Sequence, residues 1–193
     1  MNSRAMPDTD KAVLRFIRGD DEAFTQIVRQ WEGRVYNLAF RALGNREDAQ
    51  DVAQETFISF FRSGRDLRDP GRFKPWLYRV ALNHCRARWR SRPPEVAVED
   101  AAMEAGSGDG LNALNDLVGQ GARDSVEVRD LVQKALAGLS QDHRMAIILK
   151  EYLGLSLEEV AQVMECPLST AKSRLYHGLR DVQRRLLRLG ARP

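Results

Sequence analysis

The chain is poor in the residues from which catalytic and metal centres are most often built. It has two cysteines, Cys85 and Cys166, which are too few for a disulfide framework or a spaced metal cluster. Its three histidines, His84, His143 and His177, stand at no catalytic spacing, and the sequence has no glycine-rich phosphate loop. We therefore predict a protein that is not an enzyme, with no catalytic residue, no metal site and no cofactor.

Long hydrophobic runs are also missing. No apolar run approaches the ~20 residues of a membrane span, and residues 1–10 lack the basic and apolar pattern of a signal peptide. Hydrophobic residues make up 43% of the chain, as in a soluble globular protein. We expect a cytoplasmic protein with no part inserted in a membrane.

The net charge of +3 conceals three segments of different sign. Residues 72–92 hold seven cations and no acid, and residues 131–193 have a net charge of +4. Between them, residues 93–130 hold nine acids against Arg123 and Arg129, which gives a net charge of −7. Two basic modules on either side of an acidic connector indicate nucleic acid as a partner.

Residues 156–189 predict two helices separated by a tight break. Ser156 and Glu159 are spaced as a capping box, in which each side chain accepts the backbone N–H of the other residue. Pro167 suits the first turn of a second helix. That second helix has an apolar stripe at three- and four-residue steps, made by Leu168, Ala171, Leu175, Leu179, Val182, Leu186 and Leu189.

The opposite side of that second helix carries small hydroxyls, cations and one aromatic ring, from Ser169, Lys172, Ser173, Tyr176, His177 and Arg180. Such side chains suit phosphate and base-edge contacts in a major groove. A DNA-binding helix-turn-helix is the favoured interpretation. An ordinary helical hairpin with a basic solvated face is the alternative.

Three amphipathic helices are predicted before residue 64. The first spans residues 8–18, the second begins at Asp20 or Asp21 and ends at Gly44, and Asn45 caps the third. The third helix is expected to bury Ala49, Val52, Ala53, Phe57, Phe60 and Phe61. Another face of it, either solvated surface or a docking face for a basic partner helix, carries Glu47, Asp51, Glu55 and Ile58.

Cations interleaved with aromatic rings fill residues 73–90. Four side chains step by four, three and four residues and therefore share an outer helical face: Arg79, Asn83, Arg86 and Arg90. The aromatic rings among them are Phe73, Trp76, Tyr78 and Trp89. Cations that hold phosphates and rings that stack on unpaired bases are what single-strand binding needs. The alternative, that the rings are core, is expected to hold for one or two of them.

Residues 93–124 are acidic and rich in glycine, and Pro93 and Pro94 end the preceding helix. A loop of this length inside one compact domain would be unusual, so we interpret it as a flexible linker. Two more helices are expected after it, over residues 126–137 and from a Ser140 cap to Leu153. The predicted fold class is all-α, with two small helical domains, residues 8–92 and 125–190, joined by the acidic linker 93–124.

Three stretches in this order resemble conserved motifs of bacterial σ factors. Residues 48–57 (DAQDVAQETF) look like the region 2 signature, and residues 73–83 (FKPWLYRVALN) resemble the segment that follows it. Residues 155–161 (LSLEEVA) and 166–175 (CPLSTAKSRL) resemble region 4. Two domains and a short linker are the layout of the extracytoplasmic-function (ECF, group 4) σ factors of the σ70 family. The resemblance extends over nearly the whole chain from about residue 11.

The resemblance implies a promoter-specificity subunit of RNA polymerase that an anti-σ factor holds inactive. The first domain would bind the β′ clamp helices of the polymerase core through Asp48, Asp51, Gln54, Glu55 and Ile58. It would read and hold the melted −10 element with Leu67, Phe73, Lys74, Trp76, Arg79, Asn83, Arg86 and Arg90. Within that set, Asn83 and the Leu67 loop match the family's pocket for a flipped base.

The second domain, by the same resemblance, would bind the polymerase β flap and place its last helix in the −35 major groove. The residues expected to contact −35 DNA are Ser169, Thr170, Lys172, Ser173, Arg174, Tyr176, His177 and Arg180. The linker would follow the RNA exit path, where its acids imitate nucleic acid.

Some positions depart from the family pattern. Ser140 replaces a usual Pro, Ala171 replaces a usual Val, and Gly178 stands in a more basic, helix-favouring stretch of the family. A glycine inside a helix costs about 1 kcal/mol.

Two other classes of protein remain as alternatives. A one-component helix-turn-helix regulator would need a ligand pocket or dimerisation helix but not the 48–57 motif, and an enzyme would need turnover without polymerase.

Overall fold

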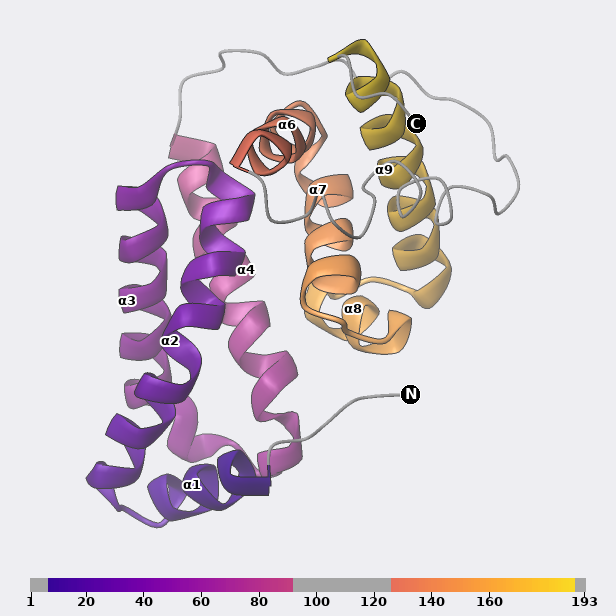
Figure 1. Ribbon diagram of the computed structural model, residues 1–193. Helices are drawn as coiled ribbons and strands as arrows, with labels where there is room; N and C mark the ends of the chain where they lie inside the picture. The colour runs from indigo at the N-terminus through magenta and orange to yellow at the C-terminus, as the bar shows by residue number, and fades with distance from the viewer. Residues whose placement is uncertain (1–6, 92–125, 190–193) are drawn as a thin grey trace. The chain divides into compact units, whose positions relative to one another are not determined.

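A computed structural model describes residues 7–91 and 126–189, which fold into helices with no β-strand among them (Figure 1). The chain divides after Ser91 into two units. Helices α1 to α4 form the first, and α6 to α9 belong to the second. The predicted all-α fold class is confirmed. The linker predicted for residues 93–124 lies outside the described residues.

The first unit consists of α1 (Pro7–Ile17), α2 (Asp21–Leu43), α3 (Arg46–Ser63) and α4 (Phe73–Ser91). Two short 3₁₀ turns, Gly64–Asp66 and Pro70–Arg72, connect α3 to α4. The long α2 packs against each of the other three helices, and α1 also contacts both 3₁₀ turns. The three long helices therefore enclose one core, and α1 closes one end of it (Figure 1).

Local signals begin and end these helices as predicted. The Asp20 carboxylate accepts the backbone N–H groups of Glu22 (3.0 Å) and Ala23 (3.3 Å), which caps α2. The amide oxygen of Asn45 caps α3 in the same way. Gly44 ends α2 at a φ of 71°, a left-handed conformation that glycine adopts without steric cost.

Aromatic rings from all four helices meet in the core of the first unit. The Phe60 ring centroid lies 4.9 Å from that of Phe16 and 5.0 Å from that of Phe73, and Trp31 meets Phe73 edge-on at 5.3 Å. Such tilted and edge-to-face pairs add to the free energy of burial. The indole N–H of Trp31 donates to the Thr9 hydroxyl, so the one polar atom of the ring is satisfied.

The second unit contains α6 (Val126–Ala137), α7 (Gln141–Ile147), a π-helical segment (Ile148–Tyr152), α8 (Leu157–Met164) and α9 (Leu168–Arg188). The Ser140 hydroxyl accepts the His143 N–H and begins α7 as predicted. The long α9 packs against α6 and α7. Its predicted apolar stripe is buried from Ala171 to Leu186.

The helix-turn-helix is formed by α8 and α9. The capping box is confirmed, because the Ser156 N–H donates to Glu159 Oε2 (2.7 Å) and the Glu159 N–H donates to Ser156 Oγ (3.1 Å). Between the helices, Glu165 has a φ of 53°, the one positive φ among the described residues other than glycine. A non-glycine residue in this conformation is strained, and it makes the tight turn that precedes Pro167.

A few positions expected to be buried are exposed instead. Phe61 is 48% exposed, and Thr56 takes an inward position on α3, where its hydroxyl donates to the Val52 carbonyl (2.7 Å). Tyr152 is 45% exposed, although the helical period places it inward. The π-helical segment explains this, because its wider turn shifts the residues that follow it around the helix axis.

Candidate functional surfaces

A row of three carboxylates runs along α3, and one arginine of α4 meets all three. Arg88 Nη2 lies 2.9 Å from Glu55 Oε1 and 3.2 Å from Asp51 Oδ2, and its Nη1 lies 3.9 Å from Asp48 Oδ1. The Arg88 side chain is 29% exposed, so these ion pairs are partly shielded from water. Three of the five predicted polymerase-binding residues therefore already have a cation of this chain beside them.

His84, one turn before Arg88 on α4, extends this cluster. Its Nδ1 lies 3.2 Å from Glu55 Oε2, and its Nε2 lies 3.2 Å from the Ser59 hydroxyl. Both carboxylate oxygens of Glu55 thus face basic groups of α4. Sequence reasoning missed Arg88 and His84 as members of this cluster, although their four-residue spacing matches that of Asp51 and Glu55 and could have indicated it.

Gln54 and Ile58, the other two predicted polymerase-binding residues, lie on a different side of α3. They line an open groove of about 860 Å³ between α2 and α3, whose other lining residues include Phe24, Val28, Tyr36, Phe57 and Phe61. Ile58 is 41% exposed there. The predicted docking face is therefore divided into an acidic row against α4 and an apolar groove against α2.

The predicted −10 face of α4 consists of four side chains about one helical turn apart: Arg79, Asn83, Arg86 and Arg90. Asn83 and Arg90 are exposed, and Arg79 and Arg86 are half-buried. Trp76 is also half-buried, with its ring 5.7 Å from the Phe60 ring. Arg88 lies on the opposite side of α4 from these residues, since two residues along a helix correspond to about 200°. Arg88 is therefore a cation of the basic segment 72–92 that faces α3 and does not belong to the predicted −10 face of α4.

The start of α4 supplies a different environment for the remaining predicted −10 residues. Leu67 and Lys74 are half-buried. Phe73 is 1% exposed and packs between Trp31 and Phe60. The Phe73 ring is therefore part of the core and not of the outer face of α4, and its contact with the −10 strand stays a prediction. Tyr78, also 1% exposed, is core for the same reason.

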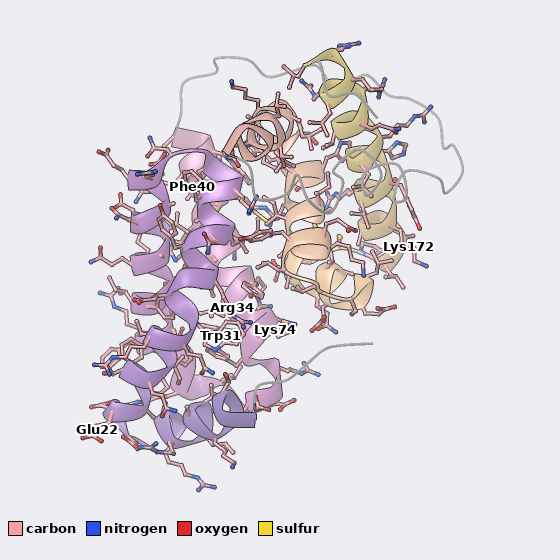
Figure 2. The ribbon with its side chains drawn as sticks, in the orientation of Figure 1. Glu22, Trp31, Arg34, Phe40, Lys74 and Lys172 are labelled. Carbon is pink, nitrogen blue, oxygen red and sulfur yellow. The ribbon has the colours of Figure 1, made fainter. Side chains whose placement is uncertain are left out.

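The predicted −35 residues of α9 fall into two groups. Ser169, Lys172, Ser173, Tyr176 and Arg180 are exposed and recur at helical spacing, so they form one outer face. Lys172 projects from α9 into solvent in Figure 2. Thr170, Arg174 and His177 are half-buried on the neighbouring flank.

That flank is turned toward α7. Arg174 Nη2 lies 2.5 Å from Asp142 Oδ2, and the His177 ring stacks on the His143 ring at a centroid distance of 6.2 Å. Arg174 thus joins the two helices of its own unit and does not belong to the outer face. Sequence periodicity missed this, because Asp142 and His143 are more than thirty residues away in the chain.

The residues that the structure describes offer little for metal binding or nucleophilic chemistry. Across residues 7–91 and 126–189, no three His, Cys, Asp or Glu side chains gather as a metal-ligand set. Burial raises the pKa of the Cys85 thiol to about 12, so it is not a thiolate nucleophile at neutral pH. None of the described helices is long and apolar enough to span a bilayer.

Two family models match this chain. Residues 27–93 match the family model "Sigma-70 region 2", and residues 129–182 match "Sigma-70, region 4". The first range contains the acidic row and the basic run, and the second contains α7, α8 and α9 as far as residue 182. The class that these matches define is the σ70 family of bacterial σ factors.

Full-length relatives specify the branch of that family. The chain is 37% identical over 181 residues to the RNA polymerase sigma-H factor of Pseudomonas aeruginosa, covering 90% of this chain and 91% of the relative. It is 31% identical to the ECF RNA polymerase sigma factor SigW of Bacillus subtilis, covering 92% and 96%. It is 36% identical to the ECF RNA polymerase sigma-E factor of Escherichia coli K12, covering 87% and 89%. This chain belongs to the ECF σ factors.

Solved structures show the same fold. CnrH, in complex with the cytosolic domain of CnrY, superimposes with a TM-score of 0.66 at 25% identity, covering 94% of this chain and 98% of that one. The sigma factor RpoE of Bartonella quintana, solved with the anti-sigma factor NepR, gives a TM-score of 0.64 at 24% identity, covering 86% and 98%.

Proposed function

We propose that this chain binds the RNA polymerase core and directs it to promoters by reading a −10 and a −35 element. The observation that carries the proposal is the presence, on one ECF-family chain, of a basic outer face on α4 beside the half-buried Trp76 ring and of an exposed face of hydroxyls and cations on α9 of the helix-turn-helix. Single-strand and duplex surfaces on one chain suit a factor that both locates a promoter and holds it open.

Polymerase binding is assigned to α3 and the groove beside it. Asp48, Asp51 and Glu55 supply negative charge for a basic partner helix, and the apolar groove around Gln54 and Ile58 supplies buried area. Charge complementarity guides association and orientation, while apolar burial provides most of the affinity. The partner on the core would be the β′ clamp helices.

Reading of the −10 element is assigned to the outer face of α4. Arg79, Asn83, Arg86 and Arg90 would hold the unpaired strand, with Trp76 as the half-exposed ring beside them. Leu67 and Lys74 would border the same site from the start of α4 and the loop before it. Cations neutralise phosphates and rings stack on bases without requiring a duplex.

Reading of the −35 element is assigned to the outer face of α9. Ser169, Lys172, Ser173, Tyr176 and Arg180 would enter the major groove, with Thr170 and His177 at its edge. Arg174, paired with Asp142, would hold α9 at its angle to α7. The second unit would also bind the β flap.

The remaining assignments follow from this role. The domains would be residues 8–92 and 125–190, with 93–124 as an acidic linker along the RNA exit path. Because the similar sigma factor RpoE was solved in complex with the anti-sigma factor NepR, we propose that an anti-σ factor also binds this chain. Such a factor would keep this chain from the polymerase. The protein would act in the cytoplasm, where polymerase and DNA are, and would catalyse no reaction of its own.

Reconstitution with RNA polymerase core over a promoter library tests the proposal. The full-length chain should copurify with core and give transcripts whose start sites share −10 and −35 sequences. Core alone on the same templates is the control. A one-component regulator would instead bind its operator without core and fail to copurify with it, and that result would contradict the proposal.

A further inference from the structure

Beyond residue 85 the side chains of α4 are at most half-buried, the Trp89 ring among them, so ion pairs join apolar packing in holding this end of the helix. The buried residues of α4 are Phe73, Leu77, Tyr78, Ala81, Leu82 and Cys85, so full burial stops at residue 85. The helix continues for six residues to Ser91, and this extension carries Arg86 and Arg90. A helix end with few buried side chains frays unless other contacts hold it.

Arg88 provides such contacts from within the extension. Its guanidinium faces Asp48, Asp51 and Glu55, which span two turns of α3, or about 10 Å along its axis. A planar guanidinium with five N–H donors can serve several carboxylates at once, which a single ammonium group does less well. One side chain thereby attaches the end of α4 to two turns of α3.

Arg88 also stabilises α3, because it lies among three carboxylates that repel one another. Asp48, Asp51 and Glu55 lie at three- and four-residue steps, and like charges at such steps destabilise a helix. Arg88 lies among them, and His84 approaches the second oxygen of Glu55. The pairs are partly exposed, so each contributes modestly and their combined geometry matters more than any single contact.

We propose that Arg88 is a positioning residue for −10 strand binding, which holds the Arg86 and Arg90 end of α4 in place by its ion pairs with α3. Arg88 itself does not touch DNA, because it projects from the opposite side of the helix. The inference rests on the proposed assignment of the α4 outer face to the melted strand. It also means that the acidic row serves the promoter-reading helix as well as the polymerase.

The test measures binding of a fluorescent −10 single strand to reconstituted holoenzyme at saturating core. Arg88→Met removes the charge and keeps the apolar length, and it should weaken strand binding about tenfold, the loss expected for one or two charge-assisted contacts. Arg88→Lys should recover part of that loss. Arg29→Met, on the exposed side of α2 and outside every proposed surface, should bind the strand like the unaltered chain.

A double-mutant cycle separates positioning from general damage. Glu55→Gln removes one of the three ion pairs of Arg88 and should weaken strand binding by a smaller factor. The Arg88→Met, Glu55→Gln double variant should lose little more than Arg88→Met alone, since that variant already lacks the pair with Glu55. If the losses of strand affinity in the two single variants multiply in the double variant, the two residues act independently and the inference is overturned. So would full strand affinity in Arg88→Met. If Arg88→Met does not fold, Arg88→Lys and Glu55→Gln carry the same comparison, and an unchanged affinity in both has the same meaning.

Arg86→Ala distinguishes this inference from the function on which it rests. If Arg86→Ala leaves strand binding unchanged, the assignment of the α4 outer face to the −10 strand fails, and the inference fails with it. If Arg86→Ala weakens binding and Arg88→Met does not, only the positioning role of Arg88 is wrong.

Discussion

Gly178 of α9 approaches His143 of α7 so closely that a Cβ on residue 178 would lie 3.1 Å from the His143 carbonyl oxygen. It would also lie 3.0 Å from Cδ1 of Ile147. The cost of a glycine inside a helix, about 1 kcal/mol, is therefore offset by the close packing of α7 and α9. This contact places the outer face of α9 relative to the rest of its unit.

Gly178→Ala is expected to destabilise the second unit by about 1 kcal/mol. The added methyl group gains helix propensity, but it would lie closer to the His143 carbonyl oxygen than an ordinary van der Waals contact, and overpacking of this kind costs about 1–3 kcal/mol. Gly33→Ala is the matched control, because Gly33 lies inside α2 and nothing lies within 4 Å of the place that an added methyl group would take. That variant should gain about 0.5–1 kcal/mol. Chemical denaturation measures both, and a gain in stability at both positions would contradict the packing argument.

Substitutions of Asp51 and Glu55 are expected to differ in their effects on stability and on core binding, although both residues lie in the acidic row of α3. Both Glu55 oxygens face α4 groups, so Glu55→Gln should lower the free energy of unfolding by about 1 kcal/mol. Asp51 is 53% exposed, so Asp51→Asn should cost about 0.5 kcal/mol or less while weakening core binding severalfold. Denaturation and a core-binding titration measure the two effects. The expectation fails if Asp51→Asn binds core normally, or if the two variants are equally stable.

The two DNA surfaces are expected to respond differently to a promoter with a pre-opened bubble. Asn83→Ala and Arg86→Ala should lose activity on duplex DNA and regain part of it on the bubble, since strand opening is then supplied. Lys172→Ala and Tyr176→Ala should gain less, because a bubble does not replace docking on the −35 duplex. Open-complex formation on matched templates is the measurement. Equal rescue of both pairs would refute the division of roles.

Asp20 predicts a pH dependence of stability in the first unit. The hydrogen bond from Arg15, with smaller contributions from the α2 N-cap, holds the pKa of Asp20 below its ordinary value of 3.8. A carboxyl with a lowered folded pKa stabilises the fold above pH 3.8, and this contribution is lost as the pH falls through the folded pKa. Asp20→Asn keeps the cap but loses the ion pair.

The difference in unfolding free energy between Asp20→Asn and the unaltered chain should therefore be present at pH 7 and shrink toward pH 3. Arg15→Met removes the same ion pair from the other side and should show the same trend. Denaturant unfolding at several pH values measures the difference. A difference that stays constant over this range would mean that the Asp20 charge contributes nothing.

Helices, their ends and the helix-turn-helix could be predicted from the sequence because their causes are local. The Ser156 and Glu159 capping box, the Asp20 and Asn45 caps and the apolar stripe of α9 involve residues within a few turns of one another. The family motifs are local for the same reason. Periodicity also located the outer faces of α4 and α9, since side-chain direction follows from helix geometry alone.

The tertiary structure alone decided which predicted surface residues face other helices. Phe73 is core because Trp31 and Phe60 enclose its ring, and Arg174 is turned inward because Asp142 meets it from α7. The three acids of α3 have Arg88 beside them only because α3 and α4 pack with those sides together. Each outcome depends on the rotation of one helix against another. That rotation is determined by the packing of the whole core, and no local pattern of sequence contains it.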